Sequence, residues 1–262
     1  MSALQWGLSV SLAGELAEPA VVAELAATAE GAGWDGVFVW DHLWNRTGEP
    51  FADAWVTLAA VALATERVRI GTLVTPLPRR RPQVVAQHAA TLDRLSGGRV
   101  TLGFGLGHDR YGEYSAFGEP DTDLRSRARL LDGGLELLVQ MLSGEPVASA
   151  GDRRTTVDCV QQPRCPIWIA GSVEHGAGSR RVARHGLEGV ALVGTESWTP
   201  EHVSAALAAG GFAPGAIEVV LVGGSHPAPT ALAAAGATWA VPEIWLGTSR
   251  ADALDLAGRP PR

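Results

Sequence analysis

An aspartate and a histidine stand side by side at Asp41 and His42, directly after the apolar run 36–40. A neighbouring carboxylate can hold an imidazole in one tautomer and move its pKa across neutrality, which suits a proton donor or acceptor. The alternative is a structural histidine whose ring bonds a backbone carbonyl. The pair is therefore a candidate for acid–base chemistry, and Trp44 in the same loop is a candidate for contact with a ligand.

A second candidate is the segment 103–109, which reads Gly-Phe-Gly-Leu-Gly-His-Asp and follows the apolar stretch 99–102. Three glycines in five residues at a strand end let a flat ligand approach the backbone without meeting a Cβ atom. The spacing departs from the G-x-G-x-x-G fingerprint, and no helical pattern begins directly after it. Gly105, Gly107 and His108 are thus candidates for a ligand site other than a dinucleotide-binding turn.

Residues 170–179 form a glycine-rich segment that opens a helical pattern. Free backbone N–H groups at such a start, together with a serine hydroxyl, can bind phosphate. The other interpretation is an ordinary helix cap without a ligand. The candidate phosphate-binding residues are Gly171, Ser172, Gly176 and Gly178.

The run Arg79-Arg80-Arg81 lies between two prolines. It is either a solvated loop or a clamp for an anionic cofactor tail or substrate carboxylate, for which guanidinium groups are well shaped. All 21 basic residues of the chain are arginines. Any anion must therefore be bound by arginine or by backbone N–H groups.

Composition indicates one large α/β domain with a small-molecule ligand. The chain has 262 residues, 46% of them hydrophobic, and a net charge of -7, which argues against nucleic-acid or anionic-membrane partners. The two cysteines, Cys159 and Cys165, match neither a zinc nor a redox spacing. The start lacks the basic residues of a signal peptide, and the apolar stretch 55–64 is too short to span a bilayer, so we expect a cytoplasmic protein.

Strand-like and helical runs alternate along the whole chain, the pattern of parallel βα units. Strands are expected at residues 4–10, 36–40, 68–74, 99–104, 167–170, 189–193, 217–222 and 238–241. Helices are expected at residues 19–32, 52–65, 82–95, 122–142, 176–186, 200–209, 230–235 and 250–257. Eight such units predict a (β/α)8 TIM barrel as a single domain over 1–262, with an irregular insertion at 143–164. Ligands of this fold bind where the strands end, which is where the candidate residues fall.

Several blocks resemble the luciferase-like monooxygenase family, whose enzymes use a flavin or a deazaflavin. Ala-Thr-Leu-Asp-Arg-Leu-Ser-Gly-Gly-Arg-Val at 90–100 continues into the glycine segment and into Glu-Tyr-Ser-Ala-Phe-Gly at 113–118. Residues 33–43, 69–76 and 166–171 agree with the family in the same order. The resemblance implies a luciferase-like barrel and an oxidoreductase acting on a small organic substrate, by monooxygenation or by hydride transfer.

The resemblance also implies roles for particular residues. His42 and Asp41 would lie beside the reactive carbon of the ring, and the ring would rest on a bulge of Thr72, Leu73 and Val74. That bulge would contain a non-prolyl cis peptide bond at Thr72–Leu73 or Leu73–Val74. Gly105, Gly107 and His108 would contact the cofactor, and the segment Gly171 to Gly178 would hold its phosphate. Independently of the resemblance, the loop position of Trp44 and the guanidinium of Arg79 make both residues candidates for contact with the substrate.

The Asp-His pair and the arginine run favour coenzyme F420 as the cofactor, with FMN as the alternative. His108 stands where sugar-phosphate-oxidising relatives have a catalytic glutamate, which makes a sugar phosphate a doubtful substrate. Family members commonly dimerise through helices beside the second and third strands. We therefore expect a homodimer that uses the apolar helix 52–65.

Two other functions fit parts of the sequence. A non-catalytic cofactor-binding homologue or subunit would have the same fold, and no motif excludes it. A metal-dependent hydrolase would use a set of acidic and histidine side chains, but the first strand offers no histidine pair, and we expect no metal. The residues of that set are Asp41, His42, His108, Asp109 and His175.

Overall fold

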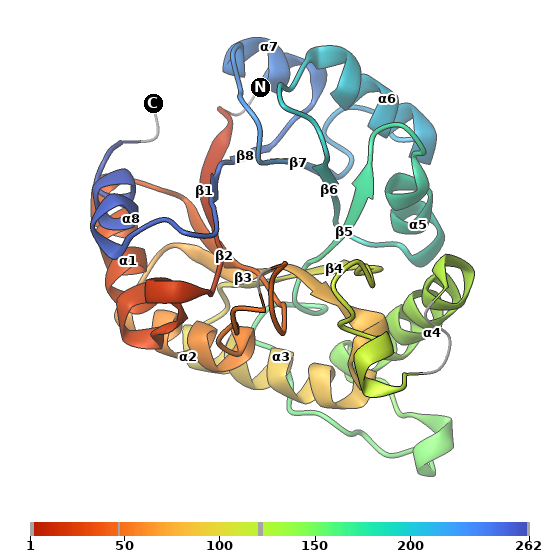
Figure 1. The fold of residues 1–262 in the computed structure, drawn as a ribbon. Coiled ribbons are helices and arrows are strands. Elements are labelled where there is room, and N and C mark those ends of the chain that lie inside the picture. The colour runs from red at the N-terminus through yellow and green to blue at the C-terminus, as the bar shows by residue number, and fades with distance from the viewer. Residues whose placement is uncertain (1–2, 47, 120–122, 261–262) are drawn as a thin grey trace.

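The chain folds into a closed parallel barrel surrounded by helices (Figure 1). The computed structural model describes residues 3–46, 48–119 and 123–260. Its strands are β1 (Gln5–Val10), β2 (Gly36–Val39), β3 (Arg69–Pro76), β4 (Val100–Gly105), β5 (Ile167–Ser172), β6 (Gly189–Val193), β7 (Glu218–Val222), β8 (Trp239–Val241) and the short β9 (Glu243–Ile244). The barrel closes because β1 pairs with β2 on one side and with β8 on the other, all in parallel. The predicted TIM barrel is confirmed.

A helix follows each barrel strand, within a few residues of the predicted bounds. The helices are α1 (Pro19–Ala32), α2 (Ala54–Ala64), α3 (Pro82–Ser96), α4 (Leu124–Leu142), α5 (Ala177–His185), α6 (Pro200–Gly210), α7 (Pro229–Ala235) and α8 (Arg250–Ala257). Helix α3 ends at Ser96, one residue later than predicted, because Gly97 adopts a left-handed conformation with φ of 69°. None of the described helices combines the length and apolarity that a bilayer crossing requires.

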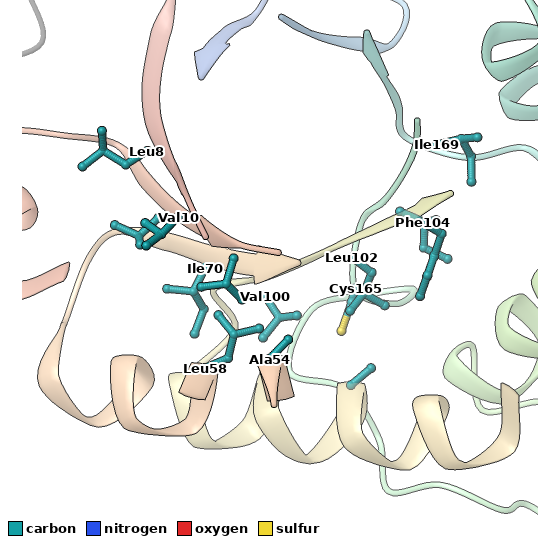
Figure 2. Close-up of a cluster of buried hydrophobic side chains, with 14 of the residues drawn as sticks. Leu8, Val10, Ala54, Leu58, Ile70, Val100, Leu102, Phe104, Cys165 and Ile169 are labelled. Atoms are coloured by element: carbon teal, nitrogen blue, oxygen red, sulfur yellow. The ribbon is translucent and has the colours of Figure 1, made fainter. Parts of the chain in front are cut away.

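The main core lies between the barrel and its helices. In Figure 2, side chains of β1, β3 and β4 pack toward α2 and α3, and Ile169 of β5 extends the cluster. Leu8, Ile70, Leu102 and Leu58 in this layer are fully buried. Burying such side chains is the main force that holds helices onto a parallel sheet.

A second cluster fills the inside of the barrel. Phe38, Trp168 and Trp239 pack against one another with ring centroids 5.2 to 5.8 Å apart. The Glu218 carboxylate accepts hydrogen bonds from the indoles of Trp168 and Trp239 and pairs with Arg69 at 2.8 Å. The interior is therefore plugged by side chains, and Leu73 and Val222 of this cluster also line the cavity described below.

The segment between α4 and β5 is the irregular excursion that its composition predicts. It contains one short 3-10 turn at Ala148–Ala150 and an isolated antiparallel bridge between Val147 and Arg153. The buried Asp93 carboxylate of α3 ties it down by accepting the N–H groups of Val160 and Gln161.

Candidate functional site

A cavity of about 280 Å³ opens where the strands of the barrel end. Its walls come from the ends of β2, β3, β6 and β7, from the segment after β4, and from β9. The lining residues are Trp40, Asp41, His42, Leu73, Val74, Pro76, Gly107, His108, Val193, Val222, Glu243 and Trp245. Six of the predicted site residues are thus brought together: Asp41, His42, Leu73, Val74, Gly107 and His108.

His42 is held by a glutamate and not, as predicted, by Asp41 or a backbone carbonyl. Its Nδ1 atom lies 3.0 Å from Oε2 of Glu113, while Oε1 of Glu113 accepts from the backbone N–H of Leu43 at 2.7 Å. The hydrogen bonds from His42 and Leu43 and the charge of Arg79 lower the pKa of the buried Glu113 carboxyl to about 2, although burial alone would raise it.

An ionised Glu113 can only accept, so Nδ1 of His42 must carry the proton in this bond. Nε2 of His42 then has its lone pair available in the neutral ring, and it has no hydrogen-bond partner among the described residues. A histidine that lines a cavity with one nitrogen fixed and the other free is arranged to take or give a proton. The acid–base role of His42 stays a prediction, and the residue that orients the ring is Glu113.

Asp41 anchors arginines instead. Its carboxylate, in a side chain 2% exposed, accepts from Thr75 Oγ1 at 2.9 Å and from Arg80 Nη2 at 2.6 Å. It also pairs with Arg79 Nη2 at 3.0 Å, and Arg79 bridges to Glu113 at 2.7 Å. Asp41, Arg79 and Glu113 therefore form one buried chain of charges that ends at His42.

The arginine run is neither a solvated loop nor an open clamp. Arg79 is 7% exposed and Arg80 21% exposed, and both guanidinium groups are held by carboxylates. Burial lowers the pKa of Arg80, but the Asp41 and Asp53 carboxylates outweigh it and raise the pKa above its usual value. Only Arg81 is exposed. The substrate role predicted for Arg79 would require it to leave these partners.

The third strand contains the bulge that the family resemblance implies. The peptide bond Leu73–Val74 is cis, one of the two predicted positions, and the register with β4 shifts between Thr72 and Thr75. The Thr72 hydroxyl donates to the Gly103 carbonyl at 3.0 Å and is buried away from the cavity. Leu73 and Val74 reach the cavity wall, whereas Thr72 is outside it.

The three glycines at the end of β4 and just after it make room for the protein's own packing. A Cβ atom at Gly103 would collide with the Thr72 carbonyl, and one at Gly105 would lie 3.0 Å from Cγ2 of Val74. Gly107 has φ of 62°, and a Cβ atom there would lie 2.6 Å from the Tyr114 hydroxyl. The glycines therefore let the bulge of β3 sit against β4, and of the three only Gly107 lines the cavity.

Aromatic residues around the cavity differ in part from the prediction. Trp44 donates its indole N–H to the Tyr111 carbonyl at 2.7 Å and packs on Phe117, outside the cavity lining. Trp40 and Trp245 line it instead, with ring centroids 5.3 Å apart. Trp40 ends the predicted second strand and Trp245 stands four residues after the predicted eighth strand, and these places were the sequence signal that could have identified them.

His108 also lines the cavity, with its ring 5.8 Å from that of His42. Burial, followed by the positive charge of a protonated His42, lowers the pKa of His108. A neutral His108 beside His42 keeps this wall uncharged at neutral pH.

The predicted phosphate segment lies at the neighbouring strand end, outside the cavity lining. Helix α5 begins at Ala177, and its first N–H groups have no intrahelical carbonyl to bond. The Ser172 side chain is exposed at this end, while Ser179 in the first turn is buried, and its hydroxyl has no hydrogen-bond partner among the described residues. Gly171 and Gly178 pack directly on each other: a Cβ atom at Gly171 would lie 3.0 Å from the Gly178 Cα atom.

The metal-hydrolase set is not assembled. Asp109 accepts the backbone N–H groups of Tyr114 and Ser115, and the His175 side chain is 74% exposed. Among the described residues, the one group of histidine, cysteine and acidic side chains close enough to share a metal is Asp93 with Cys159 and Cys165. None of these three lines the cavity, and the Asp93 carboxylate already accepts hydrogen bonds from Val160 and Gln161.

Known proteins resemble this chain in sequence and in fold. An F420-dependent glucose-6-phosphate dehydrogenase of Beutenbergia cavernae is 39% identical over 151 residues, which cover 55% of this chain and 44% of that protein. The chain spans about half the length of the relatives of this kind that it matches.

Two solved structures share the barrel. An F420-dependent secondary alcohol dehydrogenase, in complex with an F420-acetone adduct, superposes with a TM-score of 0.66 at 25% identity, covering 85% of this chain and 69% of that one. The coenzyme F420-dependent tetrahydromethanopterin reductase of Methanopyrus kandleri superposes with a TM-score of 0.74, covering 99% and 98% of the two chains, and at 16% identity it shows the common fold alone.

Residues 3–235 match the family described as luciferase-like monooxygenase. This match covers most of the chain and includes the β3 bulge, the glycine segment and the His42 loop. The chain belongs to the luciferase-like monooxygenase family.

Proposed function

We propose that this protein is an F420-dependent oxidoreductase that transfers hydride between the deazaflavin and a small organic substrate. The observation that carries the proposal is the free Nε2 atom of His42, fixed through Nδ1 by Glu113 at a cavity beside the β3 bulge. The F420-dependent relatives and the F420-containing structural neighbour support the choice of cofactor.

The described residues fit such a cofactor. Leu73 and Val74, where the register of β3 with β4 shifts, form an apolar wall on one side of the cavity, against which a flat ring would rest. At the neighbouring strand end, the free N–H groups of α5 and the unpartnered Ser179 hydroxyl offer donors to a phosphate. Gly171, Ser172, Gly176 and Gly178 are the residues we propose for that contact.

When bound, F420 would accept or donate the hydride, and a side chain of the protein would accept or donate the proton. For oxidation of an alcohol, Nε2 of His42 would accept the hydroxyl proton as the C–H hydride leaves. For the reverse reaction, the protonated ring would return the proton to the carbonyl oxygen. Glu113 stabilises the charged imidazole and keeps Nδ1 as a donor, while the buried Arg79 and Asp41 hold Glu113 in place.

Cofactor binding tests the proposal directly. Titration with F420 and, separately, with FMN should give the tighter complex with F420, measured by the change in cofactor fluorescence and checked by calorimetry. Reduction of bound F420 by an organic substrate then distinguishes an enzyme from a non-catalytic binding homologue. Failure to bind F420, or tight binding of FMN alone, would contradict the proposal.

Removing one hydroxyl from the phosphate segment should weaken F420 binding modestly. Ser172→Ala should cost about 1 kcal/mol of binding free energy, because one hydrogen bond is lost while the backbone donors stay. Ser179→Ala should have an effect of the same size. The matched control is Ser204→Ala on α6, an exposed serine whose hydroxyl bonds only the Pro200 carbonyl. Calorimetric titration measures all four proteins, and unchanged affinity in both test variants would place the phosphate elsewhere.

We also propose a homodimer formed through α2 and α3. Apolar side chains on these helices face solvent, including Val56 at 65% and Leu63 at 74% exposure. A shallow, mostly apolar groove lies between the two helices, lined by Trp55, Ala59 and Leu92 among others. An exposed apolar face of this kind is typical of a self-association surface.

Leu63→Glu should convert such a dimer into a monomer, because it places a charge in an apolar interface. Light scattering of the wild type should give twice the chain mass of 27.3 kDa, and the variant should give the single mass. Leu130→Glu on α4 is the control, since Leu130 is exposed but lies on another helix. A wild type that scatters as a monomer at micromolar concentration would refute the dimer.

A further inference from the structure

Glu243 lines the cavity, and the chemistry proposed above gives its carboxyl group no role. It follows Pro242 at the end of the eighth strand, and its register partner on β1 is Ser9. The side chain lies against Gly223 at the end of β7, where a Cβ atom would collide with the carboxylate. Glu243 and His42 both line the same cavity.

The Glu243 carboxyl has no hydrogen-bond or ion-pair partner among the described residues, although it is partly buried. Burial is the cause that raises its pKa to about 7. The other two acidic side chains near the site differ, because Asp41 and Glu113 are each held by arginine. Burying a polar group without a hydrogen-bond partner costs folding free energy. An unpartnered carboxyl group in the wall of a cavity is therefore a candidate for binding a ligand.

Cationic side chains are missing from the described lining of the cavity. The nearby Arg79 and Arg80 are committed to Asp41 and Glu113, and the chain contains no lysine. The remaining walls are mostly apolar, formed by Trp40, Trp245 and four aliphatic side chains. A phosphate dianion would therefore find no counter-charge there, while its approach to Glu243 would be unfavourable.

We propose that Glu243 binds the hydroxyl or carbonyl group of the substrate, and that the cavity selects uncharged, largely apolar alcohols and ketones over phosphorylated sugars. The carboxylic acid of Glu243 donates a hydrogen bond to the hydroxyl or carbonyl oxygen, so the hydroxyl proton stays available to Nε2 of His42. This inference rests on the proposed function, because it names the substrate class of that same site. It also separates this chain from the sugar-phosphate specificity in the names of its relatives.

Binding can be tested without turnover, using cyclohexanol and glucose 6-phosphate as probes. Saturation-transfer NMR on the full chain, with and without F420, should detect cyclohexanol bound to the wild type and no glucose 6-phosphate. Glu243→Leu should weaken cyclohexanol binding about tenfold through the lost hydrogen bond. Glu243→Gln keeps a donor and an acceptor and should stay within about threefold of the wild type.

The control is Glu196→Leu, an exposed glutamate in the loop after β6 at the same end of the barrel. Its cyclohexanol affinity should equal that of the wild type. Glucose 6-phosphate binding as tight as cyclohexanol binding would overturn the inference, and so would equal cyclohexanol affinities in Glu243→Leu and Glu196→Leu. The inference would also be overturned if Glu243→Leu lost its affinity for F420 and kept its affinity for cyclohexanol. That result would show that the carboxyl group contacts the cofactor. A wild type that binds cyclohexanol through Glu243 but does not bind F420 would support the pocket assignment and refute the proposed cofactor.

Discussion

His42→Ala should lower the rate of F420 reduction by an alcohol by about 10² to 10⁴, the usual contribution of a positioned acid or base. The affinity for F420 should change far less, because the variant removes an imidazole at the cavity wall and leaves the phosphate segment intact. Stopped-flow measurement of the loss of oxidised F420 gives the rate, and fluorescence titration gives the affinity. His202→Ala, at the start of α6, is the control.

Glu113→Gln separates proton transfer from simple packing at the same site. The amide keeps the size of the side chain but removes the charge that stabilises a protonated His42, so we expect an intermediate loss of rate. The same stopped-flow measurement of F420 reduction should place the Glu113→Gln rate between those of the wild type and of His42→Ala. A His42→Ala protein with full turnover would show that the histidine is structural.

The repetitive parts of the fold could be predicted from the sequence because they depend on local patterns. Helix α1 and helix α8 begin and end at the predicted residues, and β6 matches as well. Glycine and proline residues indicate where such elements begin and end. Buried parallel strands appear in the sequence as continuous apolar runs. The cis bond at Leu73–Val74 was located through the family resemblance and not through any local pattern.

The orienting partner of His42 could not be predicted, because it depends on contacts between distant segments. Glu113 is 71 residues from His42 in the chain, and Arg79 is 34 residues from Glu113. The adjacent Asp41 was the natural choice from sequence alone, but its carboxylate points to Thr75 and Arg80. Asp41 and His42 therefore have different partners although they are adjacent in the chain.

The sequence contained only a weak indication that Glu243 belongs to the site. It stands two residues after the predicted eighth strand, where side chains of a TIM barrel reach the ligand. One acidic residue in a loop gives no reason to expect burial, so its place in the cavity became evident only when β9 was seen to pair with β1.

Asp41→Asn should destabilise the protein by about 3 kcal/mol, although it changes neither the size nor the shape of the side chain. The carboxylate is buried and holds Arg79 and Arg80, and removing one partner of a buried ion pair leaves uncompensated charge behind. We place the expected loss at the lower end of the range for such pairs, because Arg80 is partly exposed and also pairs with Asp53.

Urea unfolding at neutral pH, followed by tryptophan fluorescence, measures the difference in the free energy of unfolding. The matched control is Asp255→Asn on α8, whose exposed carboxylate pairs with the exposed Arg259 just after the helix ends. Surface pairs of this kind contribute about 0.3 to 0.5 kcal/mol, so the control should lie close to the wild type. If both variants lose equally little stability, the buried charges contribute no more than an exposed pair. In that case Asp41 and its arginines cannot be what holds Glu113 and His42 in place.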